Sequence, residues 1–336
     1  MKGYNFIFIL YFFFCLMFLN IWGINAIEEK IDFEFFADSE TYMLLYNMGY
    51  SISELIALNW NLIGPLMILK IFSGNFYLVF LLNMLVLYVS FYGVIKNYQL
   101  NNNKFLLLII LSPLMIGSVI GINKEIFSFL VISLLLQYNA NKKLKYLILG
   151  VLLSILVRWQ MTLVCLIFAF ITSPANPFRK NRLKSLLIMI IGVSVIYPLN
   201  ISLFEHVDNV ATLGASKATE GSGLYSFLIS IQNQLFGYCL VFIPKALFLF
   251  GGLVFRFQKM LDFSDLYNNL FVFSQSVFNL LLLYIVIKRK QWLSNDFVYF
   301  AFIYLIVFCI SPIFAPRYLI PVTLLFICTV SQKKIL

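Results

Sequence analysis

Long apolar runs separated by short basic loops are the feature that most restricts what this chain can fold into. Runs of about twenty apolar residues, the length that spans a bilayer as a helix, recur along the sequence. Of the 336 residues, 62% are hydrophobic and only 11% are charged, a composition that excludes a soluble globular domain. Backbone polar groups inside a bilayer must be paired within the chain. The sequence therefore predicts an all-α polytopic membrane protein with a single transmembrane domain over residues 1–336.

The basic loops predict the topology, because positive charge in short loops favours the cytoplasmic side. If these loops lie inside, two apolar runs separate each successive pair, and the chain crosses the bilayer about ten times. Residues 4–24 form an apolar run without a cleavage site, so we expect a retained first span and cytoplasmic N- and C-termini. The basic segments are 96–104, 141–145, 174–184, 288–290 and 332–336.

Two long segments, 25–74 and 201–267, are predicted to be outer loops. Each contains an apolar run, 55–72 and 235–255, that would break the alternation if it crossed, so we expect interfacial or re-entrant helices there. The second run, with Lys245 and the following Arg256 and Lys259, is typical of a basic helix on an anionic membrane surface. In this arrangement every acidic residue except Asp296 lies outside.

Several function classes are disfavoured by what the sequence carries. The net charge of +10 is scattered between apolar runs and forms no single basic face, so no nucleic-acid partner is expected. The five cysteines lie in apolar runs without the spacing of metal or disulfide sites, and the one histidine, His206, falls in an outer loop. No glycine-rich phosphate loop is present. We therefore predict no cofactor and no metal.

Four charged residues are predicted at the outer mouths of the spans: Lys124, Glu125, Arg158 and Arg317. A charge at membrane depth costs about 2.5–3.5 kcal/mol on insertion scales, so each needs a reason. They could be snorkelling anchors or ion pairs between turns. Three cations facing one compartment would also suit the phosphate or pyrophosphate of a lipid carrier. We favour the interpretation as a site for a lipid-carrier phosphate. Gln160, two positions after Arg158, is added as a further substrate contact.

Asp38 and Glu40 are the candidate catalytic residues. They lie in the first outer segment, where the chain becomes apolar and aromatic on both sides of them. A solvated acidic loop is the alternative, and it fits the preceding acids, Glu28 to Glu34, better. A carboxylate that is partly desolvated at a membrane surface can accept a proton from a sugar hydroxyl. The pattern therefore indicates a general base.

These motifs resemble those of polytopic glycosyltransferases. The first span, the outer acidic loop before Tyr42 and the apolar run with Gly64-Pro65 are similar to lipid-sugar-dependent enzymes of the GT-C type. The turns Asn-Lys-Glu at 123–125 and Val-Arg-Trp-Gln at 157–160, with Pro-Arg-Tyr-Leu-Ile-Pro at 316–321, resemble the O-antigen and capsule polysaccharide polymerases. The likeness covers most of the chain in layout, through motifs of three to six residues.

The resemblance implies roles for individual residues. In GT-C enzymes the acidic residue of the first outer loop is a catalytic base or a metal ligand, which implies Asp38 here, with Glu40 as the fallback. Arginines in the outer loops of the polymerases hold the carrier pyrophosphate, which implies Arg158 and Arg317. The paired Asp-Glu of the mannosyltransferases is split here by Ser39, so that subfamily is less favoured.

The predicted function is that of a glycosyltransferase or polymerase in surface polysaccharide biosynthesis, such as that of O-antigen, lipopolysaccharide or capsule. It would join sugar units carried on polyprenyl pyrophosphate at the periplasmic face of a bacterial inner membrane. The expected partners are the polyprenyl-linked oligosaccharide, membrane lipid and other membrane proteins of polysaccharide assembly. One alternative is a GT-C enzyme that adds a single sugar from a polyprenyl monophosphate donor. The other is a flippase for the lipid-linked unit.

Overall fold

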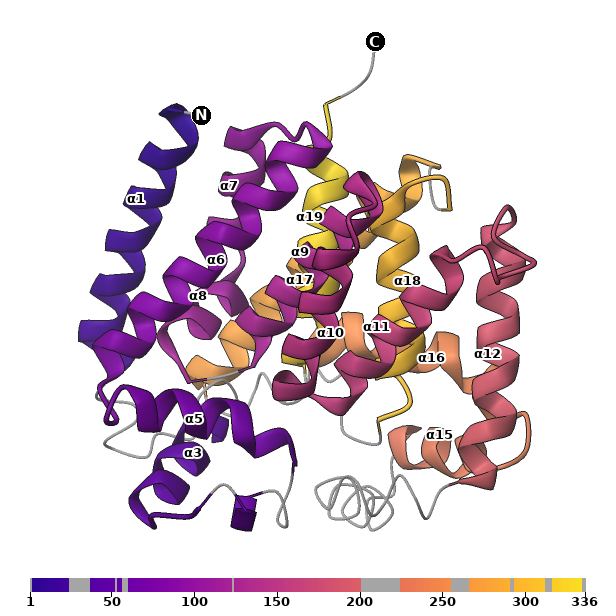
Figure 1. Cartoon of the computed structure of the whole chain (residues 1–336), viewed down its shortest axis with the longest axis horizontal. Helices are drawn as coiled ribbons and strands as arrows, with labels where there is room; N and C mark the ends of the chain where they lie inside the picture. Colours follow the sequence, from indigo (N-terminus) through magenta and orange to yellow (C-terminus); the bar gives the residue numbers. More distant parts are fainter. Residues whose placement is uncertain are drawn as a thin grey trace.

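The computed structural model is all-helical, with no β-strand among the residues that it describes (Figure 1). These residues are 2–23, 37–51, 53–55, 60–122, 124–200, 224–254, 266–290, 293–311 and 316–333. The helices of the bundle include α1 (Lys2–Phe18), α6 (Phe76–Tyr98), α7 (Asn102–Ile110), α8 (Pro113–Ile120), α9 (Glu125–Asn141), α10 (Leu144–Val157), α11 (Trp159–Thr172), α12 (Arg182–Leu199), α17 (Leu266–Lys288), α18 (Asp296–Phe308) and α19 (Ile320–Ser331). Around them lie η1 (Leu19–Gly23), α3 (Ala37–Asn47), η2 (Trp60–Leu62), α5 (Ile63–Ile71), α15 (Leu224–Gln232), α16 (Gly237–Gly251), η3 (Gly252–Val254) and η6 (Pro316–Leu319).

Asparagine caps fix where several helices begin. The side chains of Asn75, Asn101, Asn181 and Asn295 each accept a hydrogen bond from a backbone N–H in the first turn of the helix that follows. Such a cap satisfies one of the N–H groups that a helix start leaves unpaired. Pro113, at the first position of α8, starts that helix after a 77° bend from α7.

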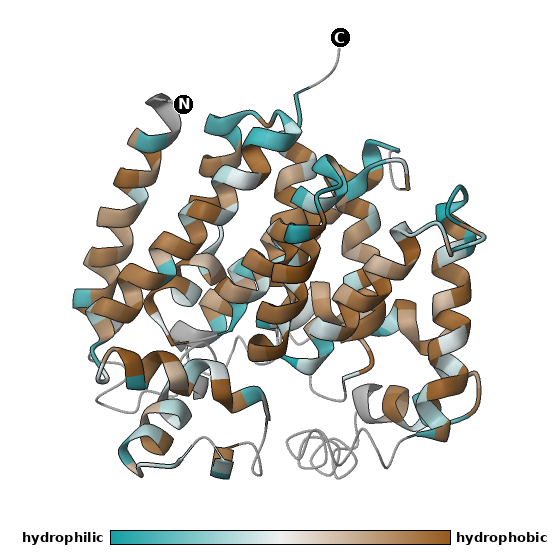
Figure 2. Cartoon of the chain, viewed as in Figure 1, coloured by the Kyte–Doolittle hydropathy of each residue, from teal (hydrophilic) through white to brown (hydrophobic). Residues whose placement is uncertain are grey.

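The described residues of the five basic segments lie together at one end of the helix bundle, which we call the basic end. Figure 2 shows hydrophilic residues gathered at the end where both termini lie. Contacts between Asn97 and Asn141 and between Leu100 and Gln332 join three of them. Residues of the other two contact helices nearby, Arg182 with Asp296 and Arg289 with Thr329. Asp296, the one acid predicted inside, is thus paired with an arginine there. The clustering is what the sequence predicts for loops that face one compartment.

The lengths of the helices support a membrane protein without fixing ten crossings. Among the described residues, three helices are long and apolar enough to span a membrane, or four if the bent pair of α7 and α8 is one span. Six other apolar helices have 10–17 residues. A helix of 14 residues, such as α10, rises about 21 Å, short of the roughly 30 Å hydrocarbon core. The predicted ten crossings therefore depend on these shorter helices.

Helix α5 covers the opposite end of the bundle, together with α3 (Figure 1). It has nine residues, fewer than the roughly 20 that a span needs. The interfacial or re-entrant position predicted for the 55–72 run stays a prediction. A Cβ added at Gly64 would lie 2.2 Å from the backbone oxygen of Leu156 in α10. Glycine is therefore required for the close approach of α5 to the end of α10. This contact places α5 directly over the α10–α11 turn.

Helix α16 differs from the predicted basic helix on the membrane surface, because its lysine is buried. Lys245 is 1% exposed. Its Nζ donates to Gln232 Oε1 at 2.6 Å and to the backbone oxygen of Ser311 at 3.0 Å. A buried ammonium group is tolerated where such oxygens replace its water. The surface prediction is wrong for Lys245, and its companions Arg256 and Lys259 lie outside the described residues.

Candidate functional site

A buried ion pair forms the centre of the candidate site, at the end of the bundle opposite the basic end. Arg158 separates α10 from α11, because its backbone is extended, with φ −164°. Its Nη2 donates to Oε1 of Glu125, the first residue of α9, at 2.5 Å. Arg158 is 6% exposed and Glu125 3%. Burial of two charges is unfavourable unless they are paired, so each residue stabilises the other here.

Arg158 and Arg317, distant in sequence, meet at the ring of Tyr318. The Arg158 guanidinium lies 4.6 Å from the ring centroid and that of Arg317 lies 5.9 Å from it. Arginine over an aromatic face is a favourable cation–π arrangement. The backbone oxygen of Tyr318 accepts a hydrogen bond from buried Tyr304 at 3.0 Å, which fixes the start of α19. The ring thus holds both arginines in one place.

Lys124 adds a third cation beside this pair. It is buried, and its Nζ lies 5.6 Å from the centroid of the Tyr42 ring in α3. Its backbone N–H donates to Oε2 of Glu125 at 3.0 Å. Glu125 therefore accepts from the guanidinium of Arg158 and from the backbone of Lys124. The sequence analysis gave ion pairs between turns as the alternative to a ligand site, and Glu125 and Arg158 form such a pair.

Ser39 attaches the predicted catalytic segment to the same turn. Its buried hydroxyl donates to the backbone oxygen of Ile122 at 3.0 Å and accepts from the backbone N–H of Ile122 at 2.9 Å. Asp38 and Glu40 flank Ser39 in α3, and their side chains lie outside the described part of the structure. The helix that carries both acids is thus fixed to a residue two positions before Lys124.

The remaining predicted contact, Gln160, lies half-buried in the first turn of α11. Its neighbour Trp159 donates its backbone N–H to Asn61 Oδ1 in η2 at 3.4 Å. The short helix η2, which directly precedes α5, therefore also contacts this turn. Sequence reasoning did not assign the structural roles of Ser39, Tyr42 and Tyr318. Ser39 and Tyr318 are sequence neighbours of predicted site residues, and this adjacency is the one sequence feature that points to them.

The charges of the site suit an anionic ligand. Lys124, Arg158 and Arg317 with Glu125 give these four side chains a net charge of +2. Nε of Arg158 is buried and has no hydrogen-bond acceptor among the described residues. A buried donor without an acceptor is unfavourable until a ligand or water supplies one. Among the described residues no group of three or more His, Cys, Asp or Glu side chains could hold a metal ion.

Comparison of the chain with protein-family models, with curated proteins and with solved structures finds no match.

Proposed function

We propose that this protein is a membrane glycosyltransferase of the polysaccharide-polymerase class, acting on sugar units carried by polyprenyl pyrophosphate. In this proposal the chain crosses a bacterial inner membrane about ten times, with the basic end in the cytoplasm and the site in the periplasmic half. One observation carries the proposal. Two arginines lie close to one tyrosine ring beside a buried glutamate, next to the helix that carries Asp38 and Glu40.

The short helices give this site a recessed position. Helices α10 and α11 have 14 residues each, so each rises about 21 Å from the basic end against a hydrocarbon core of roughly 30 Å. The α10–α11 turn with Arg158 would then lie below the outer surface, under the cover of α5. Charges in such surroundings interact strongly with a bound anion because little water screens them. A carrier could reach the turn from the lipid with its tail between helices.

The chemistry is a transfer of a glycosyl group between oxygens. Asp38, or Glu40 in its place, accepts the proton of the acceptor hydroxyl while that oxygen attacks the anomeric carbon of the donor. The bond from the anomeric carbon to the pyrophosphate oxygen breaks, and polyprenyl pyrophosphate leaves with the electron pair. Arg158, Arg317 and Lys124 stabilise the charge that develops on it. The proton stays on the carboxyl group until it passes to water.

The test is the length of surface polysaccharide, measured by gel, in a strain that lacks this gene. The strain is complemented with wild type, Arg317→Ala, Asp38→Asn or the control Lys104→Ala, which removes one exposed cation at the basic end. Membrane levels are matched by immunoblot. Removing one such stabilising donor typically costs about 10²–10³ in turnover, so we expect a single repeat unit with Arg317→Ala and a full ladder with Lys104→Ala.

The outcomes separate the proposal from its alternatives. A full ladder in the deletion strain would end the polymerase reading. Loss of even the first repeat unit would point to a transferase that adds a single sugar or to a flippase. A full ladder with Arg317→Ala would show that Arg317 does not stabilise the leaving pyrophosphate. A purified protein that extends the chain without nucleotide would support the proposed donor.

A further inference from the structure

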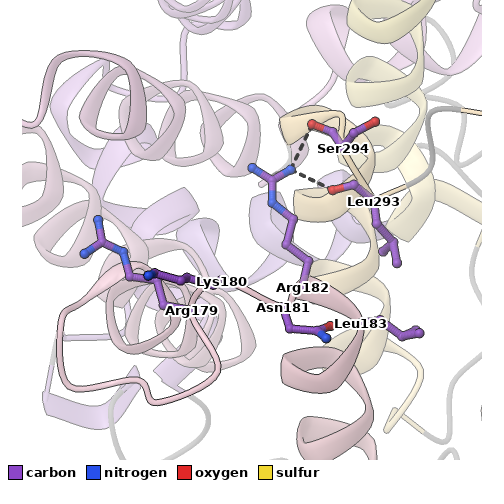
Figure 3. A pocket seen from close by; sticks show the side chains of 7 residues that line it. All are labelled: Arg179, Lys180, Asn181, Arg182, Leu183, Leu293 and Ser294. Atoms are coloured by element: carbon purple, nitrogen blue, oxygen red, sulfur yellow. Dashed lines mark hydrogen bonds between the residues drawn. The ribbon is translucent and has the colours of Figure 1, made fainter.

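The basic end contains a pocket that the proposed function does not use. Its volume is about 400 Å³, within the roughly 300–1,000 Å³ of small-ligand sites. Figure 3 shows Arg182 on one side, bonded to the backbone oxygens of Leu293 and Ser294, with Arg179 and Lys180 on the other. The lining residues are Arg179, Lys180, Asn181, Arg182, Leu183, Leu293 and Ser294. Three of the seven are cations and none is acidic.

The charge around the pocket is largely uncompensated. Asp296 pairs with Arg182 at 2.5 Å and also accepts from Asn139, so it neutralises one cation. Burial and the positive charge of Arg179 lower the pKa of Lys142 at the end of α9, and Asp296 opposes this only in part. Arg179 and Lys180 are exposed in the turn before α12. An anion entering the pocket would meet a positive potential from several sides.

The surface next to the pocket is apolar. Helix α12 is long and apolar enough to span a membrane, yet only 17% of its apolar stretch is buried within the protein. Its exposed side chains include Leu183, Leu187 and Ile191, each about half exposed and spaced at helical intervals that place them along α12 from the pocket. Such a face beside a basic pocket matches a ligand with an anionic head and apolar tails. A soluble anion would make no use of it.

We propose that this pocket binds the phosphodiester headgroup of an anionic phospholipid, with Arg179 and Lys180 contacting the phosphate and the acyl chains lying along α12. Asn181, the N-cap of α12, occupies the first turn with its own side chain, so the arginine and lysine carry the recognition. Basic pockets at the cytoplasmic ends of membrane helices are suited to such lipids. The inference concerns the basic end and stands whether or not the proposed enzymatic activity is correct.

The test is lipid binding to the full chain purified in neutral detergent, followed by native mass spectrometry. The probes are dioleoyl phosphatidylglycerol, dioleoyl phosphatidylcholine and inorganic phosphate. The pocket variant is Arg179→Gln with Lys180→Gln, and the matched control is Lys288→Gln with Lys290→Gln, which removes two exposed charges that do not line the pocket. We expect phosphatidylglycerol affinity to fall about tenfold or more in the pocket variant and by less than about twofold in the control.

Three results would overturn the inference. Equal losses in the two double variants would show attraction to net charge alone. Phosphatidylcholine binding as tightly as phosphatidylglycerol would show that the tails and not the anionic head are recognised. Inorganic phosphate displacing the lipid at millimolar concentration would make the pocket a site for a soluble anion. A melting temperature of each variant equal to that of wild type, as expected for ordinary surface changes, establishes that binding is measured on folded protein.

Discussion

Two ion pairs of equal length lie at opposite ends of this molecule in different surroundings. Glu125 and Arg158 approach to 2.5 Å with side chains 4% and 7% exposed, whereas Asp296 and Arg182 approach to 2.5 Å with side chains 33% exposed. Water reaches the second pair and screens it, while the first must satisfy its charges within the protein. The same chemistry therefore has a different energetic weight at each end.

The partners of the cations differ in the same way. At the basic end, Arg182 and Arg289 donate to backbone oxygens, of Leu293 and Ser294 and of Thr329 and Val330. At the site, the side chains of Arg158 and Lys124 lie against tyrosine rings, and Glu125 accepts from the Arg158 guanidinium and from the backbone N–H of Lys124. These partly exposed cations suit loop packing and orientation in a membrane. The buried ones are held by a carboxylate and by aromatic rings within the protein, an arrangement that a topology signal does not require.

The largest expected effect follows from removing the buried carboxylate. Glu125→Leu leaves the Arg158 guanidinium buried without its anionic partner, a change that costs about 3–5 kcal/mol. We expect a large fall in the thermal stability of the protein in detergent and in its level in the membrane. Both are measured against wild type.

The double variant Glu125→Leu with Arg158→Met separates structure from function. Replacement of both members of a buried pair by apolar residues of similar size is often neutral or stabilising. Stability should return while the polysaccharide ladder stays lost. A double variant that restores the ladder would show that the pair serves packing alone.

The contact between α5 and α10 gives the next effect. Gly64→Ala would bring a Cβ within 2.2 Å of the Leu156 backbone oxygen, so α5 must shift; overpacking of this kind costs about 1–3 kcal/mol. Gly192→Ala in α12 is the matched control, since nothing lies within 4 Å of its Cβ. It should be neutral or slightly stabilising. Equal melting temperatures for the two variants would contradict the close cover of the site by α5.

Ser39→Ala tests how firmly α3 is fixed to the site. It removes both hydrogen bonds to Ile122 and leaves the backbone groups of that residue without this partner, an expected loss of about 1–3 kcal/mol. Ser230→Ala, which removes an exposed bond within its own helix, should stay within about 0.5 kcal/mol. Limited proteolysis after α3 measures the local effect. Cleavage unchanged from wild type would mean that other contacts hold α3.

Much of the fold could be predicted from the sequence because it rests on local patterns. Apolar runs indicate helices, and basic loops indicate which ends lie together, as the contact between Leu100 and Gln332 shows. The sequence also singled out Arg158 and Arg317, which the structure brings to one ring. Charged residues inside or at the ends of apolar runs are rare, so each of them can be recognised from the sequence alone.

What could not be predicted depends on partners from elsewhere in the chain. Lys245 stands among aromatic residues, a pattern typical of a membrane surface, yet its partners lie 13 and 66 positions away and bury it. The same holds for Ser39, whose partner Ile122 is 83 positions distant. Periodicity reports which face of a helix is apolar and contains no information on which distant oxygen will meet a given side chain.

The smallest expected effect concerns the exposed pair, and it tests the comparison directly. Asp296→Asn removes the charge but keeps the shape, and because both side chains are a third exposed the loss should be about 0–1 kcal/mol, smaller still in high salt. Denaturant unfolding at low and high salt measures it beside Glu125→Gln. A loss equal to that of Glu125→Gln would mean that burial does not distinguish the two ends. Because Arg182 also lines the basic pocket, Asp296→Asn should leave phosphatidylglycerol binding unchanged or stronger, as the removed charge opposed the anion.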